Sequence, residues 1–152
     1  MQETLDFIVC VDRSIKPTYP KNREPHFPKY ELSGPTKYDL RELIQWQNDY
    51  QKYGQQITTG EDIYLDGPDI SDCTNLMDLI AIKEKGIAVF RAVFQGKIVF
   101  AWKSVVENDV DDVFVPLLWE QNEELVLGWR YIGRNFDHNC VALRFPPREN
   151  IQ

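Results

Sequence analysis

The sequence predicts an α+β domain, and a change of hydrophobic period near residue 97 carries this prediction. Before that point, apolar residues recur at helical spacing in two stretches, about 38–53 and 72–94. After it, they alternate with polar residues, as in half-buried strands. We therefore expect an N-terminal strand and a Pro-rich loop, then two to three helices packed on a C-terminal antiparallel meander sheet.

The bulk composition fits one globular domain covering 1–152. Hydrophobic residues make up 43% and aromatic residues 12% of the chain, which argues against disorder. No apolar stretch approaches the ~20 residues needed to span a bilayer, and Glu3 and Asp6 stand where a secretory signal would be basic. Three widely spaced cysteines suit a reducing compartment. We therefore expect a cytoplasmic protein with free thiols, Cys10 and Cys140 being buried.

The N-terminal part is expected to contain one strand and one long loop. Leu5–Asp12 is rich in β formers and apolar on both faces, so we expect it to join the sheet at a central position. Residues 16–36 include five prolines, which predict a loop without regular structure. That loop is either a rigid wrapping segment or a segment that changes between free and bound states.

Two helices are expected to follow. Thr36 and Asp39 resemble a capping pair before a helix over 38–53, which Gly54 would end. Its apolar stripe consists of Leu43, Trp46, Tyr50 and Tyr53. A short extended piece is expected at Ile63–Leu65. The second helix covers 72–94 with Asp72 or Ser71 as its cap, and Gly86 is positioned to divide it in two.

The C-terminal half is expected to form four strands joined by polar linkers of hairpin length. The strands are predicted at Lys97–Val106, Val113–Trp119, Glu124–Ile132 and Cys140–Phe145. Because proline cannot donate a ladder hydrogen bond, Pro116 indicates an edge strand or a bulge.

The charge distribution is uneven. The net charge is −7, and residues 53–82 and 104–129 contain acidic but no basic side chains. One interpretation is an acidic surface that steers a basic protein partner; the alternative is that turns favour acidic residues for solubility. The candidate partner-binding residues are Asp109, Asp111, Asp112, Glu120, Glu123, Glu124, Asp66 and Asp69. Direct nucleic-acid binding is disfavoured because it needs clustered basic residues.

No motif for metal or cofactor chemistry is present. The chain lacks a phosphate loop, a G-x-G-x-x-G sequence, a calcium loop and a CxxC pair, so we expect neither metal nor cofactor. Cys140 next to His138 resembles a nucleophile pair, but a cysteine that opens an apolar strand is typically a buried hydrophobe. Asp12 and Arg13 follow the first strand and are candidate ligand-binding residues; the alternative is a local salt bridge.

Several segments taken together resemble an uncharacterised family of small acidic proteins of bacterial and phage or prophage genomes. These segments are VDRSIKPTYP, GPTKYDL, DLIAIKEKGI, FQGKIVFAWKSVV, VPLLWEQNEELVLGWRYIG and ALRF. The resemblance implies a bacterial or phage cytoplasmic setting and supplies no catalytic residues.

Three functional hypotheses follow. The leading one is a non-enzymatic accessory protein, of phage type, that engages a protein partner through its acidic surface. The second is a small-ligand or nucleotide-derivative binding protein that uses aromatic residues with Asp12 and Arg13. The third is an enzyme whose site is assembled from residues distant in sequence. Nothing in the sequence indicates an oligomeric state.

Overall fold

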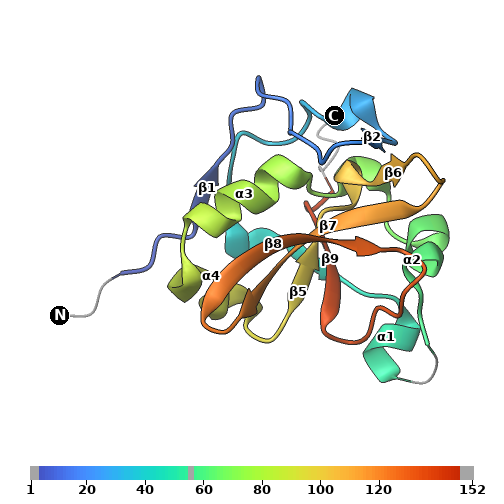
Figure 1. Cartoon of the computed structure of the whole chain (residues 1–152). Coiled ribbons are helices and arrows are strands. Elements are labelled where there is room, and N and C mark those ends of the chain that lie inside the picture. Colours follow the sequence, from blue (N-terminus) through green and yellow to red (C-terminus); the bar gives the residue numbers. More distant parts are fainter. Residues whose placement is uncertain (1–3, 55–56, 148–152) are drawn as a thin grey trace, which may run out of the picture.

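The computed structural model describes residues 4–54 and 57–147, and within them it confirms the α+β class. A curled sheet lies between α3 and α4 on one side and α2 on the other (Figure 1). The α-helices of the described part are α1 (Asp49–Tyr53), α2 (Gly60–Asp66), α3 (Leu76–Glu84) and α4 (Ile87–Phe94). No helix in these ranges is long and apolar enough to cross a membrane.

The main sheet is mixed. Its strands are β2 (Arg23–Pro25), β4 (Ile44–Trp46), β5 (Ile98–Phe100), β6 (Val106–Asn108), β7 (Val113–Gln121), β8 (Glu124–Tyr131) and β9 (Cys140–Arg144). They run in the order β2-β6-β7-β5-β9-β4, and β8 pairs with β7. β9 lies parallel to β5, so the expected antiparallel meander describes only β6, β7 and β8. The expected strand 97–106 is two strands, β5 and β6, separated by the 3₁₀ turn η4 (Trp102–Ser104).

The first strand does not join this sheet, contrary to the sequence-based expectation. β1 (Ile8–Cys10) pairs antiparallel with β3 (Lys37–Asp39) in a separate two-stranded ribbon. Val9 points into the core while Cys10 is exposed, because neighbouring strand residues face opposite sides and this ribbon has only one covered face. The prediction that Cys10 is buried is therefore wrong, whereas Cys140 is buried as expected.

The Pro-rich segment 16–36 wraps the domain and is not wholly irregular. β2 pairs with β6 within it, and the 3₁₀ turn η1 begins at Pro28, where a missing N–H costs nothing. His26 donates its backbone N–H to the carbonyl of Val105 at 2.9 Å. These contacts favour the wrapping interpretation of the segment.

The helix predicted over 38–53 is absent from the structure. Its residues form β3, the 3₁₀ turn η2 (Leu40–Glu42), β4 and the short helix α1. Asp39 caps η2, and Asn48 begins α1 through a capping box with Gln51. Pairing of β4 with β9, about a hundred residues away, overrides the local helical pattern. The apolar stripe accordingly splits: Leu43 is buried, whereas Tyr50 and Tyr53 are exposed.

The piece expected to be extended at Ile63–Leu65 lies in the helix α2. Thr59 and Asp62 form a capping box that begins this helix. Gly60 allows the first turn of α2 to approach the residue that follows β8, since a Cβ there would lie 2.7 Å from the backbone of Ile132.

The structure confirms the second predicted helical stretch, 72–94, and its division into two helices at Gly86. Gly86, at φ 94°, separates α3 from α4, as only a glycine readily does. The cap of α3 is Asn75, which forms a capping box with Asp78, and is not Ser71 or Asp72.

Pro116 lies in β7, which is neither an edge strand nor bulged at this residue. On one side β7 pairs with β8 along its length; on the other it pairs first with β6 and then with β5. The missing N–H of Pro116 faces the break between β6 and β5. Its carbonyl still accepts a bond from Ala101 at 3.1 Å, so the proline leaves no ladder bond unmade.

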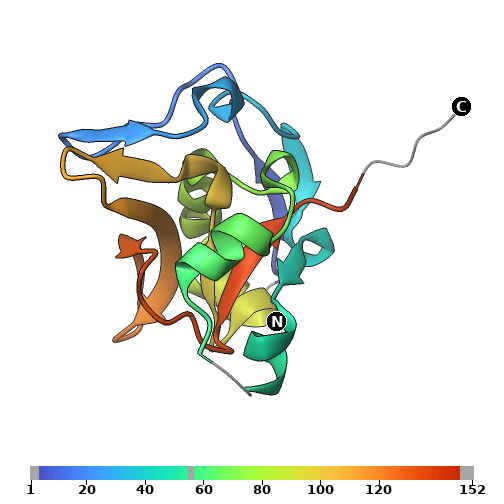
Figure 2. The same cartoon turned by 90° about the vertical axis from the view of Figure 1, so that its right-hand side faces the viewer.

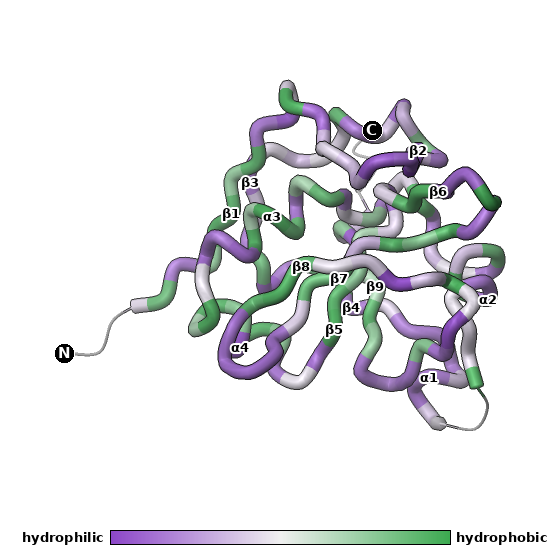
Figure 3. Tube along the Cα trace, viewed as in Figure 1, coloured by the Kyte–Doolittle hydropathy of each residue, from purple (hydrophilic) through white to green (hydrophobic). Residues whose placement is uncertain are grey.

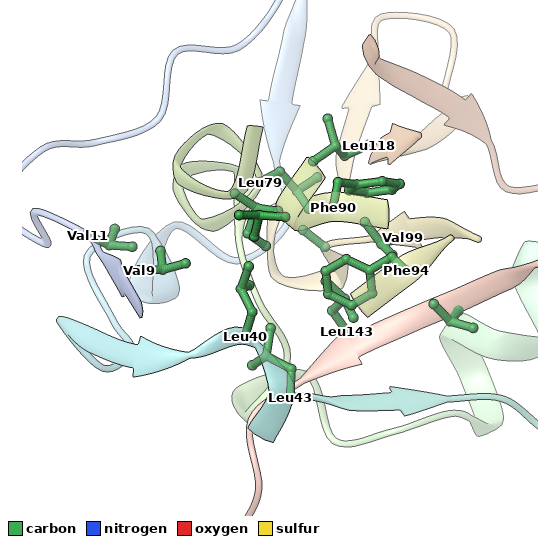
Figure 4. Packing of buried hydrophobic residues seen from close by; sticks show 14 of the residues in the cluster. Val9, Val11, Leu40, Leu43, Leu79, Phe90, Phe94, Val99, Leu118 and Leu143 are labelled. Carbon is green, nitrogen blue, oxygen red and sulfur yellow. The ribbon is translucent and has the colours of Figure 1, made fainter. Parts of the chain in front are cut away.

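The core has two parts, one on each face of the sheet. Figure 3 shows apolar residues along β5, β7 and β9 and hydrophilic residues along β2. Leu79, Phe90 and Phe94 of α3 and α4 pack with Val99 and other residues of one face (Figure 4). The opposite face packs against α2, and its members include Ile63, Phe100, Trp102, Phe136 and Cys140.

Candidate functional site: a buried lysine beside an aromatic cavity

A buried ion pair lies where the first loop meets α3. The Arg13 guanidinium donates to both oxygens of Asp78, at 2.7 and 3.2 Å, and the two side chains are 8% and 1% exposed. The Tyr38 hydroxyl donates to Oδ1 of Asp78 at 2.6 Å, and the Asn75 backbone N–H donates to Oδ2 at 2.9 Å. Each oxygen of this carboxylate therefore accepts two hydrogen bonds, and its charge is neutralised by that of Arg13.

Local sequence explains this arrangement. Asp78 occupies the third position of α3, where a carboxylate completes the capping box and favours the helix N-terminus. Arg13 also donates to the carbonyl of Pro35, at 2.7 and 3.0 Å, and so ties two distant loops together. Gly34 makes room for the guanidinium, since a Cβ there would lie 2.7 Å from Nη2.

Lys103 is the second buried basic residue, and it has no such partner. It lies in η4, where its backbone N–H donates to the carbonyl of Thr74 at 3.1 Å. The residue is only 4% exposed. Its Nζ lies 5.8 Å from the ring centroids of both Tyr30 and Phe145, a distance at the limit of cation–π attraction. Among the residues that the structure describes, none accepts a hydrogen bond from this amine or forms a salt bridge with it.

The electrostatic surroundings disfavour the charged form of Lys103. Burial lowers the pKa of Lys103 from its ordinary value; the negative charge of Asp78 opposes this shift, and the positive charge of Arg13 adds a smaller lowering. The attraction to Asp78 offsets only part of the effect of burial, because the positive charge of Arg13 counteracts it. The same surroundings raise the pKa of Tyr38, through burial and then through the Asp78 charge.

A cavity of about 530 Å³ opens beside Lys103. This volume lies within the range of small-molecule sites, which are typically apolar clefts with a few convergent polar groups. Tyr30, Tyr38 and Phe145 supply aromatic walls, and Tyr38 packs edge-on against Phe145 at 5.0 Å between centroids. The cavity draws its walls from segments that are distant in sequence.

The acidic residues around the cavity leave Lys103 without a counter-ion. Asp39 is paired with Arg41 at 2.7 Å, and Asp72 with Arg144 at 3.2 Å. Glu42 also lines the cavity but is an exposed side chain. Among the charged residues that line the cavity, Lys103 is therefore the buried one, and aromatic rings flank it.

The two predicted ligand-binding residues, Asp12 and Arg13, do not form a common site. Arg13 contributes from behind the cavity wall by holding Pro35 and Asp78, which is a structural role. Asp12 is exposed, and its carboxylate accepts bonds from the backbone and hydroxyl of Ser14. These bonds lower the pKa of Asp12 below its ordinary value.

Five of the acidic candidates from residues 104–129 lie at the two ends of strand β7. Asp109, Asp111 and Asp112 belong to the β6–β7 turn, whereas Glu123 lies in the β7–β8 turn and Glu124 begins β8. Nine residues of β7 separate the two turns, a distance of about 25–30 Å. They therefore form two clusters, and their role in steering a basic partner stays a prediction.

The remaining acidic candidates already have local partners or lie elsewhere. Glu120 forms a two-point ion pair with Arg91, at 2.6 and 2.8 Å. Asp69 caps the 3₁₀ turn η3 (Ile70–Asp72) by accepting from Ser71. Asp66 ends α2 and lines an open depression near α1.

The Cys140–His138 hypothesis has no support in the geometry. Burial raises the pKa of Cys140 to about 11, and its thiol contacts Arg130 and Asp137 instead of an imidazole. The described ranges contain no cluster of three or more His, Cys, Asp or Glu side chains arranged to hold a metal ion.

Sequence reasoning missed Lys103, Asp78 and Tyr38. Only Lys103 carried a visible signal, as the single charge inside the apolar run Ile98–Val106. Comparison with known protein families, characterised proteins and solved structures produced no match. The resemblance to a phage-associated family therefore stays a prediction.

Proposed function

We propose that this protein binds a small organic anion in the Lys103 cavity. The observation that carries the proposal is a buried lysine that lines an open cavity and whose amine has no hydrogen-bond acceptor among the described residues. Buried charges are normally paired, because an uncompensated one costs stability. A ligand carboxylate or phosphate would supply the missing counter-ion.

The aromatic residues that line the cavity indicate the chemistry of the rest of the ligand. Tyr30 and Phe145 flank Nζ at equal distances, so an anionic group held there would leave its molecular body between aromatic rings. Stacking favours a planar or aromatic body, such as an aryl carboxylate or the base of a nucleotide. This function corresponds to the small-ligand alternative drawn from the sequence, with a different set of residues.

The test is a binding titration with three probes: benzoate, a nucleoside monophosphate and inorganic phosphate. Ligand-observed NMR should detect at least one organic probe, with weaker binding of phosphate because phosphate cannot stack. The variant Lys103→Met should lose that binding at least tenfold. The matched control Lys83→Met removes an exposed lysine of α3 and should bind as the wild type does. Binding that is unchanged in Lys103→Met, or no binding of any probe, would refute the proposal.

We further infer that the protein acts in a reducing compartment such as the cytoplasm. The support is that Cys10, Cys73 and Cys140 are all free.

A further inference from the structure

Strand β8 has one unpaired edge. It pairs with β7 along its whole length, from Gln121 with Glu124 to Phe114 with Tyr131, and within residues 4–54 and 57–147 it pairs with no other strand. In Figure 2, the orange β8 lies at the outside of the sheet, and no strand is drawn beyond it. An edge of eight residues is long enough to template the addition of another strand.

The register determines which backbone groups face outward. The hairpin turn consists of Asn122 and Glu123, both with positive φ, so Gln121 and Glu124 form the hydrogen-bonded pair next to it. Bonded and non-bonded pairs alternate along an antiparallel ladder. Even-numbered residues of β8 therefore bond to β7, as the continuing bond from Ile132 N–H to the Val113 carbonyl at 3.0 Å confirms.

The outward groups belong to Leu125, Leu127 and Trp129. Within the described part of the chain, no hydrogen bond from another segment reaches the N–H or C=O of these residues. The stretch Leu125–Trp129 contains no charge, no proline and no bulge, which are the devices that normally protect an edge. The outward N–H and C=O groups of this edge are therefore available to pair with another strand.

We propose that the occupant of this edge is a second copy of the chain, paired antiparallel through β8 about a two-fold axis at Leu127. In this register Leu127 pairs with Leu127 of the second copy, and Leu125 pairs with Trp129 of the second copy. Each such pair exchanges two N–H···O=C bonds. Symmetry repeats every contact, as an isologous interface requires.

Charge favours this register over a shift along the strand. Two residues face each other across the axis when their numbers sum to twice 127, which places Glu124 opposite Arg130 of the second copy. Glu124 is exposed and has no ion pair among the described residues. The Arg130 guanidinium lies over the Phe100 and Phe136 rings and contacts Cys140 through Nη1, which leaves its other N–H groups available. Opposite charges at facing positions stabilise an antiparallel pair.

Sedimentation velocity of the full chain over a range of concentrations tests this proposal. The wild type should move from monomer to dimer as its concentration rises. Leu127→Pro removes an outward N–H without touching the bonds to β7, so it should be monomeric. The matched variant Leu127→Ala loses the side chain but keeps the N–H, and it should still dimerise.

If Leu127→Pro does not fold, charge-reversal variants at Glu124 and Arg130 still test the proposed dimer. Glu124→Arg faces Arg130 of the second copy and should weaken dimerisation at least tenfold, whereas Glu123→Arg in the turn should not. Arg130→Glu alone should also weaken it. An equimolar mixture of Glu124→Arg and Arg130→Glu should form a heterodimer, because both facing pairs are then opposite in charge.

Hydrogen exchange provides an independent readout at single residues. The amides of Leu125, Leu127 and Trp129 should become protected as concentration rises, while those of Val126 and Gly128 stay protected throughout. A wild type that remains monomeric at all concentrations would overturn the proposal. So would a dimer that is insensitive to both Leu127→Pro and Glu124→Arg.

Discussion

Replacing Lys103 with methionine is expected to stabilise the folded protein while removing its proposed binding function. Methionine keeps most of the length and the apolar stem of lysine and discards the charge. A buried donor without an acceptor costs about 1–3 kcal/mol, and more when it is charged. Attraction to Tyr30 and Phe145 offsets part of this cost, but at 5.8 Å it is weak. Because Lys103 lines an open cavity, its amine keeps part of its hydration, so the expected gain at pH 7 lies at the low end of this range, about 1 kcal/mol.

The pH dependence of that gain gives a sharper signature. Burial lowers the folded-state pKa of Lys103 from the ordinary lysine value of 10.5. Between the lowered pKa and 10.5, the unfolded chain holds more protons than the folded protein, so wild-type stability rises with pH. The advantage of Lys103→Met should consequently be greatest at neutral pH and shrink as pH rises through this window. The raised pKa of Tyr38 affects both proteins alike and cancels in the difference.

Urea unfolding of both proteins from pH 7 to 10 measures this difference. At this chain length, each kcal/mol corresponds to about 2–4 °C in Tm, so thermal scans provide a second reading. Lys83→Met serves as the control, because its exposed ammonium is already solvated. A Lys103→Met variant that is less stable than the wild type at pH 7 would refute the reasoning. So would a gain that does not change with pH.

Two further predictions concern the buried ion pair and the thiols. Asp78→Asn leaves the Arg13 charge buried without a counter-ion and should lower the free energy of unfolding by about 3–5 kcal/mol in urea titration; a loss below 1 kcal/mol would contradict the pairing. In thiol titration of the native protein, Cys10 should react rapidly because it is exposed, whereas Cys73 and Cys140 should react slowly, since burial raises their pKa values to about 12 and 11; rapid modification of Cys73 would count against its burial.

Elements with a strong local pattern could be predicted from the sequence. The second helical stretch and its division at Gly86 depend on spacing and on one backbone conformation. β7 and β8 are joined by a two-residue turn, so their pairing is local and their alternating pattern is sufficient. In these elements the prediction and the structure differ by at most two residues at each strand end.

Elements that depend on distant partners could not be predicted in this way. The stretch 38–53 has helical spacing, yet β4 within it pairs with β9, and no local pattern encodes that contact. The N-terminal strand was placed in the main sheet because it is apolar on both faces. In the structure, α3 covers one face of β1, and β3 is the one strand of the described residues that pairs with it.

The candidate site was missed for the same reason, since Arg13, Tyr38, Asp78 and Lys103 come from four separate segments. The charges of these residues explain how they act together. Arg13 and Asp78 neutralise each other, and together they hold Pro35 and Tyr38 in the cavity wall. Lys103 forms neither a hydrogen bond nor a salt bridge with that pair, because both oxygens of the carboxylate are already occupied. A chain that only needed a stable core would place methionine or leucine at this position. Retaining an unpaired amine beside an open aromatic cavity lowers stability in the free state. The same unmet charge would strengthen the binding of an anion, so the gain in stability of Lys103→Met and its loss of affinity are expected from one cause.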